Sequence, residues 1–336
     1  MLDKKLSPAL TLFLIILSCL ITFCLDTYFR QRISAKAKES ISLIETTSNH
    51  YKSGRLEGYR LIKPLVYTQK NEESALYSDI KNSLNTYIEQ LKREQKLISA
   101  SVYLRDFDQG DWMCINNDET YYPGSLIKVP GMITFLKMAE KNPSLLNKKF
   151  VFNPANKNIP NQTFNSNQIV AGKSYSIKQL LKYMISYSDN NATYLLNSNA
   201  DMKVFNQLFT DLNIPLFTKK NATITAKNFS SFLNILFDAS YLSKENSEFA
   251  VELLEACDFK LGMVKGLPAS TIVAHKFGEM GDSTMRQLHE SGLIYIHNTP
   301  YLLTVMTNGY DVTELPDIIG NISRMVYQNF INKANQ

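Results

Sequence analysis

A serine and a lysine stand three residues apart where a polar turn runs into an apolar helix. The segment reads YYPGSLIKVP over 121–130, with Ser125 at the junction and Lys128 one turn later. Residues three apart share one face of a helix, so the amine can reach the hydroxyl. Serine is a poor nucleophile until a base takes its proton. The spacing predicts a nucleophile with its activating amine, and a backbone N–H at the helix start that can bind an oxyanion.

Two further motifs follow this pair. The chain contains one S-D-N sequence, at 188–190 near a break in a helical segment, and a K-F-G sequence at 276–278 on a strand-like run. S-x-x-K recurs at 78–81, and K-x-G recurs at 52–54 and 260–262, so each of these two is weak alone. The order of the three motifs, each on the right kind of element, is the informative feature.

This order resembles that of the class A β-lactamases and related penicillin-binding proteins. The resemblance covers roughly residues 60 to 330. It implies that Ser125 becomes acylated and that Lys128 takes or relays its proton. It also implies that Ser188 helps to pass a proton to the leaving nitrogen, and that Lys276 supplies positive charge for a substrate carboxylate.

The resemblance implies substrate-binding roles for three more residues. Asn190 would hold the amide side chain of the substrate. Gly278 would let the substrate backbone lie close to the strand. The oxyanion hole would use the backbone N–H groups of Ser125 and Glu279. Asp189 is expected to fix its loop and to take no part in the chemistry.

The first departure from the family pattern is a missing acid. Class A hydrolases carry a glutamate, on a loop after the S-D-N helix, that activates the water for deacylation. The corresponding stretch here, NIPLFTKKNATITAKNF, has no carboxylate, and none occurs between Asp211 and Asp238. The acylation machinery is therefore expected to be complete and the usual deacylation base to be missing.

The second departure is Phe277, which stands where the family has a hydroxyl residue. A phenyl ring cannot donate a hydrogen bond to a substrate carboxylate, and Glu279 adds a negative charge nearby. Arg286 is a candidate for compensating positive charge. Substrate preference therefore stays open.

We expect a serine hydrolase that opens β-lactam or related amide bonds through a Ser125 acyl-enzyme, with slow deacylation. The resemblance places this in β-lactam catabolism and antibiotic resistance. A DD-peptidase acting on D-Ala-D-Ala ends of cell-wall peptides is the first alternative, and a penicillin-binding sensor without turnover is the second. No cofactor is expected. No metal is expected either, because the late histidines have no matching carboxylate spacing.

The pattern of elements predicts an α+β domain. Helical periodicity over 74–95 is followed by an alternating hairpin over 97–116. Helical segments then lie between 125 and 257, strand-like segments over 271–308, and a last helix from about 314 to 330. Strands at both ends predict an antiparallel sheet built from N- and C-terminal segments, with a helical subdomain, as in the β-lactamase/DD-peptidase fold.

The N-terminus contains an uncharged apolar run. We assign 1–7 as a short tail, 8–25 as a transmembrane anchor, 26–57 as a juxtamembrane stalk and 58–333 as the hydrolase domain. The alternative is lipoprotein processing at Cys19.

The orientation of this anchor is set by two opposing arguments. Positive residues are more numerous after the apolar run than before it, which would place the C-terminal part inside. Large domains translocate largely regardless of such charges. The implied substrates lie outside the cytoplasmic membrane, so we expect a single-pass protein of the cell membrane with an extracytoplasmic catalytic domain.

Composition narrows the list of partners. The chain is 44% hydrophobic and 20% charged, which suits a globular domain, and its net charge of +5 is scattered. No basic stripe or nucleic-acid motif is present, so nucleic acid is not an expected partner. Cys114 and Cys257 are expected to be buried thiols, with a disulfide between them as the alternative. We expect a monomer.

Overall fold

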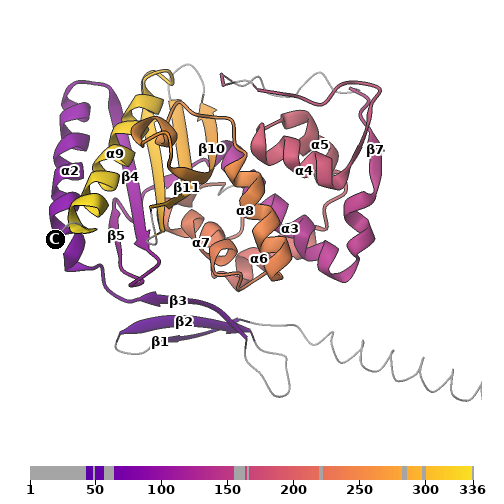
Figure 1. Cartoon of the computed structure of the whole chain (residues 1–336), viewed down its shortest axis with the longest axis horizontal. Helices are drawn as coiled ribbons and strands as arrows, with labels where there is room; N and C mark the ends of the chain where they lie inside the picture. The colour runs from indigo at the N-terminus through magenta and orange to yellow at the C-terminus, as the bar shows by residue number, and fades with distance from the viewer. Residues whose placement is uncertain are drawn as a thin grey trace, which may run out of the picture.

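The computed structural model in Figure 1 describes residues 43–47, 50–56, 64–154, 163–164, 166–218, 222–281, 286–296 and 300–334. Its main sheet has five antiparallel strands in the order β10-β11-β12-β4-β5. The early hairpin joins the late strands because β4 pairs with β12, which confirms the predicted α+β sheet. The strands are β4 (Leu97–Asp106), β5 (Trp112–Ile115), β10 (Ile272–Gly281), β11 (Arg286–Tyr295) and β12 (Tyr301–Gly309).

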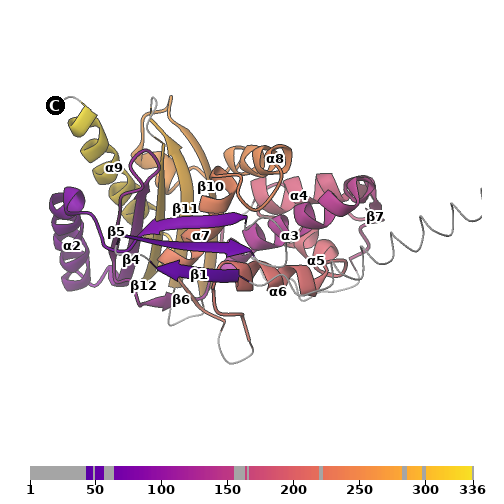
Figure 2. The same ribbon diagram turned by 90° about the horizontal axis from the view of Figure 1, so that it is seen from below.

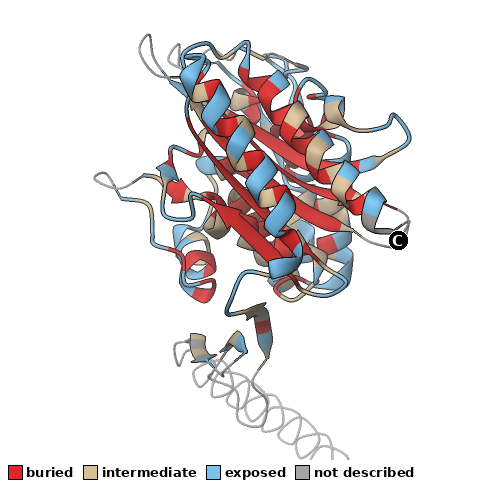
Figure 3. Ribbon diagram, turned by 90° about the vertical axis from the view of Figure 1, so that its left-hand side faces the viewer, coloured by how far each residue is buried: buried red, intermediate tan, exposed pale blue. Residues whose placement is uncertain are grey.

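Both faces of the main sheet are covered by helices, so its strands are apolar on both sides. On β4, Val102 and Leu104 belong to one apolar cluster and Tyr103 to the other. Alternate residues of a strand point to opposite faces, which explains the split. Helices α2 (Ser78–Arg93) and α9 (Leu315–Ala334) cover the first face, and Figure 3 shows them lying across buried strands.

The opposite face packs on α7 (Ala226–Phe237) and α8 (Lys244–Glu255). Beyond them lies the helical block that the sequence predicted (Figure 1). Its helices are α3 (Lys128–Lys141), α4 (Ile177–Ser186), α5 (Asn190–Asn197) and α6 (Met202–Asp211). The break expected near Ser188 is present, because α4 ends before the S-D-N sequence and α5 begins within it.

Short elements complete the described fold. Two small antiparallel pairs are β6 (Thr120–Tyr121) with β9 (Ile224–Thr225), and β7 (Lys149–Val151) with β8 (Ser174–Ser176). The 3₁₀ turns are η1 (Ala75–Tyr77), η2 (Gly124–Ile127), η3 (Pro143–Asn147) and η4 (Met263–Gly266). Because α6 ends at 211 and β9 begins at 224, the described residues between them, 212–218 and 222–223, form a loop.

A second sheet precedes the main domain. Its strands are β1 (Leu43–Thr47), β2 (Tyr51–Leu56) and β3 (Leu65–Lys70), paired in that order and visible from below in Figure 2. The sequence placed 43–56 in the stalk, but the described residues of this part form two strands, of which β2 pairs with β3 at the start of the predicted hydrolase domain. The predicted anchor at 8–25 lies outside the described residues. Within the described ranges, no helix has the length and apolar character needed to cross a membrane.

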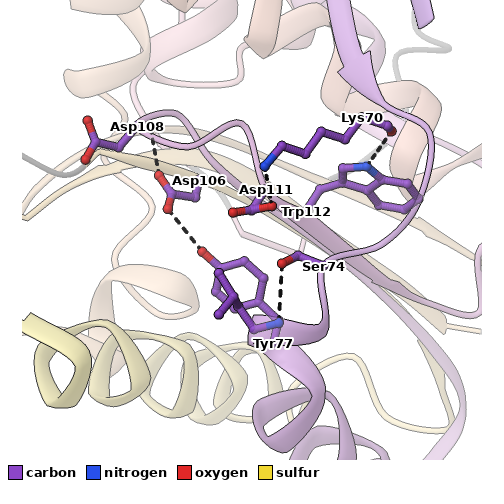
Figure 4. A network of polar contacts seen from close by, with 8 residues as sticks. Lys70, Ser74, Tyr77, Asp106, Asp108, Asp111 and Trp112 are labelled. Atoms are coloured by element: carbon purple, nitrogen blue, oxygen red, sulfur yellow. Dashed lines mark hydrogen bonds and ion pairs between the residues drawn. The ribbon is translucent and has the colours of Figure 1, made fainter. Parts of the chain in front are cut away.

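A polar network attaches the second sheet to the hairpin of the main sheet (Figure 4). Lys70 Nζ donates to Asp111 Oδ1 at 2.7 Å, and Trp112 Nε1 donates to the Lys70 carbonyl at 2.8 Å. Nearby, Tyr77 Oη donates to Asp106 Oδ2 at 3.2 Å, and Ser74 N donates to the Trp112 carbonyl at 2.9 Å. These bonds fix the end of β3 against β5 and the start of α2.

Candidate active site

The 3₁₀ turn η2 brings Ser125 and Lys128 onto one face. The Lys128 N–H donates to the carbonyl of Ser125, which closes an i to i+3 turn. Side chains three apart eclipse each other in this geometry. The predicted shared face is therefore present, although the turn is 3₁₀ and the α-helix begins only at Lys128.

Lys128 connects the η2 turn to the S-D-N sequence. Its side chain is only 3% exposed, and its Nζ donates to the Ser188 carbonyl at 2.5 Å and to Asn190 Oδ1 at 2.8 Å. The same Nζ lies 3.2 Å from the Ser188 hydroxyl. The structure thus brings together two motifs that are 60 residues apart in the chain.

Ser188 reaches Lys128 because of its backbone. Its φ is +53°, in the left-handed region that costs a non-glycine residue about 1 kcal/mol or more. The following Asp189 caps α5 by accepting from Asn191 N at 2.8 Å, and its other oxygen accepts from Ile169 N at 2.8 Å. These bonds hold the strained turn in place, which is the loop-fixing role expected of Asp189.

Burial shifts the pKa of both site lysines. Burial lowers the pKa of Lys128 well below its ordinary value, and the positive charge of Lys276 lowers it further. Burial also lowers the pKa of Lys276 to about 8, although the Cys257 thiol and nearby acids oppose this shift. A neutral Lys128 amine has a lone pair that can accept a proton from Ser125.

Two glycines let strand β10 lie against the η2 turn that carries Ser125. A Cβ atom at position 278 would lie 2.7 Å from Leu126 N and 3.0 Å from Ser125 N. A Cβ atom at position 124, where φ is +52°, would collide with the Glu279 carbonyl and lie 3.1 Å from Glu279 N. The η2 turn is therefore the close neighbour of Gly278. The approach of a substrate backbone to Gly278 stays a prediction. The backbone nitrogens of Ser125 and Glu279 both border this contact, where an oxyanion hole is expected.

Strand β11 holds the residue that leads into the turn. Gln287 Oε1 accepts from Tyr122 N at 3.1 Å, and His289 Nε2 lies 3.0 Å from the Tyr122 carbonyl. Thr307 N donates to His289 Nδ1 at 3.2 Å, so Nε2 carries the proton and donates to Tyr122. Sequence reasoning treated His289 as an ordinary strand histidine and missed Gln287. Polar side chains within a buried strand were the available signal.

A second buried histidine lies on β10. His275 Nδ1 is 2.6 Å from Glu290 Oε1, and neither side chain is exposed. Burial alone would lower the pKa of His275, but Cys257 and Glu290 raise it to about 10. Cys114 and Cys257 are free buried thiols, as predicted. Among the described residues, no cluster of three or more histidine, cysteine or acidic side chains could hold a metal ion.

A cavity of about 250 Å³ lies beside Lys128, on the side of α5 and α6. None of its lining residues carries a carboxylate, and none belongs to the described part of the loop over 212–223. The cavity is bounded by Ile127, Lys128, Gly131, Thr134, Phe135, Met184, Thr193, Asn197, Ala200, Met202 and Phe205. A water placed here would meet Lys128 and threonine or asparagine groups, with no acid within the lining.

The buried state of His289 predicts a pH dependence of stability. Burial lowers its pKa from 6.5 to about 4, so the unfolded chain takes up a proton first as the pH falls. The stabilisation is complete above pH 6.5 and is lost as the pH falls toward 4, by up to about 3 kcal/mol.

We therefore expect His289→Gln to lose less unfolding free energy than the wild type between these two pH values. Denaturant unfolding at several pH values measures the difference. Equal pH dependence of the two proteins would show that His289 does not titrate in this way.

Comparison with known proteins agrees with this fold. Beta-lactamase VEB-1 of Pseudomonas aeruginosa is 24% identical over 271 residues, covering 72% of this chain and 88% of that protein. The structure of PBP-A superposes with a TM-score of 0.63 at 19% identity, covering 76% of this chain and 97% of PBP-A. A class A β-lactamase from Mycobacterium abscessus superposes with a TM-score of 0.63 at 18% identity, covering 74% and 99% of the two chains.

A sequence model of one enzyme family matches most of the domain. The family is described as the beta-lactamase enzyme family, and the match runs over residues 79–330. This match confirms the resemblance drawn from the three motifs. The chain therefore belongs to the β-lactamase enzyme family of class A-like serine hydrolases.

Proposed function

We propose that this serine hydrolase opens β-lactam or related amide bonds by acylating Ser125, and that hydrolysis of the acyl-enzyme is its slow step. The observation that carries the proposal is the setting of Lys128. Its amine is buried against Ser188 and Asn190, while the adjacent cavity has no carboxylate.

Acylation follows from the groups around Ser125. Its Oγ forms a bond to the carbonyl carbon while Lys128 Nζ takes the hydroxyl proton. The oxyanion is stabilised by the backbone N–H groups of Ser125 and Glu279. The C–N bond then breaks, and a proton passes from Lys128 through the Ser188 hydroxyl to the leaving nitrogen. The 3.2 Å separation of Lys128 Nζ and Ser188 Oγ supports this route.

Deacylation requires a water and a base on the cavity side of the ester. General base help is worth about 10²–10⁴ in rate. Among the described residues that line the cavity, Lys128 is the only one with a strongly basic side chain, and its amine is already bonded to the S-D-N turn. We therefore place the kinetic bottleneck at hydrolysis of the Ser125 ester.

The same observation favours a second candidate, a penicillin-binding protein that stays acylated and acts as a sensor. PBP-A, whose fold is similar, has been solved as an acyl-enzyme complex of a mutant with penicillin-G. The relatives named β-lactamase support turnover instead. A DD-peptidase activity on cell-wall peptides is the third candidate. The rate of deacylation separates the DD-peptidase and the sensor from a β-lactamase.

Location is part of the proposal. The apolar run over 8–25 would anchor the chain, and the family's substrates would require the domain to face outward. Protease accessibility of the domain in intact cells tests this orientation.

The first prediction concerns the nucleophile. A β-lactam should add one acyl mass to the peptide that contains Ser125, and Ser125→Ala should abolish the label. The variant should stay folded, because loss of a small polar side chain at a helix start costs at most about 2 kcal/mol. Peptide mass spectrometry and circular dichroism check the two points. A label on another serine would overturn the assignment.

The second prediction concerns the proton acceptor. Lys128→Ala should slow acylation by about 100-fold or more, the range typical of general base catalysis. Lys128→Arg should not restore the rate, because a guanidinium does not give up its proton. Stopped-flow acylation by a chromogenic lactam measures both variants. Near-normal acylation by the arginine variant would mean that Lys128 acts only through charge or packing.

The third prediction concerns turnover. With a good β-lactam we expect a burst of one equivalent, followed by slow steady hydrolysis, with the acyl group visible by mass spectrometry. Asn197 is exposed and lines the cavity, so Asn197→Glu should place a carboxylate there. That variant should deacylate about tenfold faster or more.

Ser198→Glu is the matched control, because Ser198 is exposed at the end of the same helix and does not line the cavity. Equal deacylation by the two variants would count against the missing-acid explanation. Wild-type hydrolysis without a burst, at roughly tens per second, would show that another group supplies the base.

A further inference from the structure

Three phenylalanine side chains pack together beside strand β10, next to the candidate site. The Phe277 side chain is 2% exposed, and its ring stacks on Phe259 with 4.2 Å between centroids. Phe164 packs edge-on against both, at 5.2 Å from Phe259 and 6.3 Å from Phe277. Phe277 precedes Gly278, whose backbone touches the turn that carries Ser125. This aromatic corner, defined by Phe164, Phe259 and Phe277, therefore adjoins the nucleophile.

Acidic side chains surround the aromatic corner. Glu279 lies two residues beyond Phe277 on the same face of β10, and its Oε1 accepts from Thr163 N at 2.7 Å. Asp258 accepts a hydrogen bond from the Ser166 hydroxyl on the same segment as Phe164. Glu290 is the register partner of Phe277 on β11. Glu290 is fully buried and 2.6 Å from His275, so an incoming anion would meet the carboxylates of Glu279 and Asp258 beside an apolar wall.

Lys276, the cation of the K-F-G motif, is not placed to bind an incoming anion. Lys276 is fully buried, its Nζ donates to the Phe277 carbonyl at 2.9 Å, and it lies 4.3 Å from the centre of the Phe277 ring. Arg286 pairs with Gly281 at the far end of β10, four residues beyond Phe277, and its charge acts on Asp311. Arg286 therefore lies away from the aromatic corner, and Lys276 is buried against the Phe277 ring and carbonyl instead of being exposed to a substrate.

We infer that the aromatic corner and Glu279 select substrates that are uncharged next to the scissile bond, so that neutral lactams or amides acylate Ser125 faster than carboxylate-bearing ones. The inference rests on the proposed acylation of Ser125. An unpaired carboxylate is costly to place against apolar groups and like charges, whereas a neutral ester or alkyl group packs on aromatic rings. Phe277 is then a specificity-determining residue.

The test compares a penicillin with its own methyl ester on the full-length protein. Acylation of Ser125 is followed by intact mass, and each rate is divided by the alkaline hydrolysis rate of the same compound. We expect the ester to react faster than the acid by a factor on the order of 10 or more. Phe277→Thr removes the ring and adds a hydroxyl, so it should raise the acid rate and lower the ester-to-acid ratio several-fold.

A second variant keeps the volume of the site unchanged. Glu279→Gln removes only a charge and should also lower the ester-to-acid ratio, which provides a readout where Phe277→Thr fails to fold. Glu89→Gln is the matched control on the outer side of α2, where this side chain is 58% exposed, and should leave the ratio unchanged.

An ester-to-acid ratio of one or below in the wild type, with Ser125 labelled, would overturn the inference and leave the proposed function intact. A wild-type preference that persists unchanged in both site variants would also overturn it. Absence of Ser125 labelling by either compound would overturn the proposed function, and the inference with it.

Discussion

Two glycines allow the turn that carries Ser125 to lie against the edge strand β10. Because neither Gly124 nor Gly278 has a Cβ, the backbones approach within distances that any side chain would prevent. This contact sets the depth of Ser125 against the strand and places its N–H beside that of Glu279. His289 supports the same seam from β11 through the Tyr122 carbonyl. The position of Ser125 therefore depends on backbone packing at this contact.

Once this backbone contact is fixed, the proposed acylation depends on the burial of two amines, those of Lys128 and Lys276. Desolvation disfavours the charged form of a lysine, and a neighbouring positive charge adds to the effect. Burial lowers the pKa of both amines, and the charge of Lys276 lowers that of Lys128 further. Oxygen atoms of Ser188 and Asn190 surround the Lys128 amine without the full charge of a carboxylate. A direct ion pair would keep Lys128 protonated and useless as a base, so the choice of neutral oxygens fits a proton acceptor.

The order of motifs predicted the fold, and the folded chain brings Lys128, Ser188 and Asn190 together. This much could be predicted because the spacing of Ser125 and Lys128 and the identity of S-D-N are local properties of the chain. The strands at 43–56 were missed, since short polar strands are stabilised by a partner that is not visible in their own periodicity. The roles of Gln287 and His289 were missed for a similar reason. Their partner is Tyr122, 165 residues away in the first case, and only the folded sheet brings the two together. The aromatic corner could not be foreseen beyond Phe277 itself.

The two departures from the family pattern are the missing loop carboxylate and Phe277. They lie on different sides of Ser125 and have one physical feature in common. On the α5 side, a cavity lined largely by apolar groups stands where a base for water would be useful. On the β10 side, packed rings stand where a cation or hydroxyl would bind an anion. Both replace polar, water-ordering groups with apolar surface, while the groups needed for acyl transfer from a neutral substrate are retained. A site of this kind would keep water and anions away from the ester, so the proposed slow deacylation and the proposed preference for neutral substrates would have the same origin.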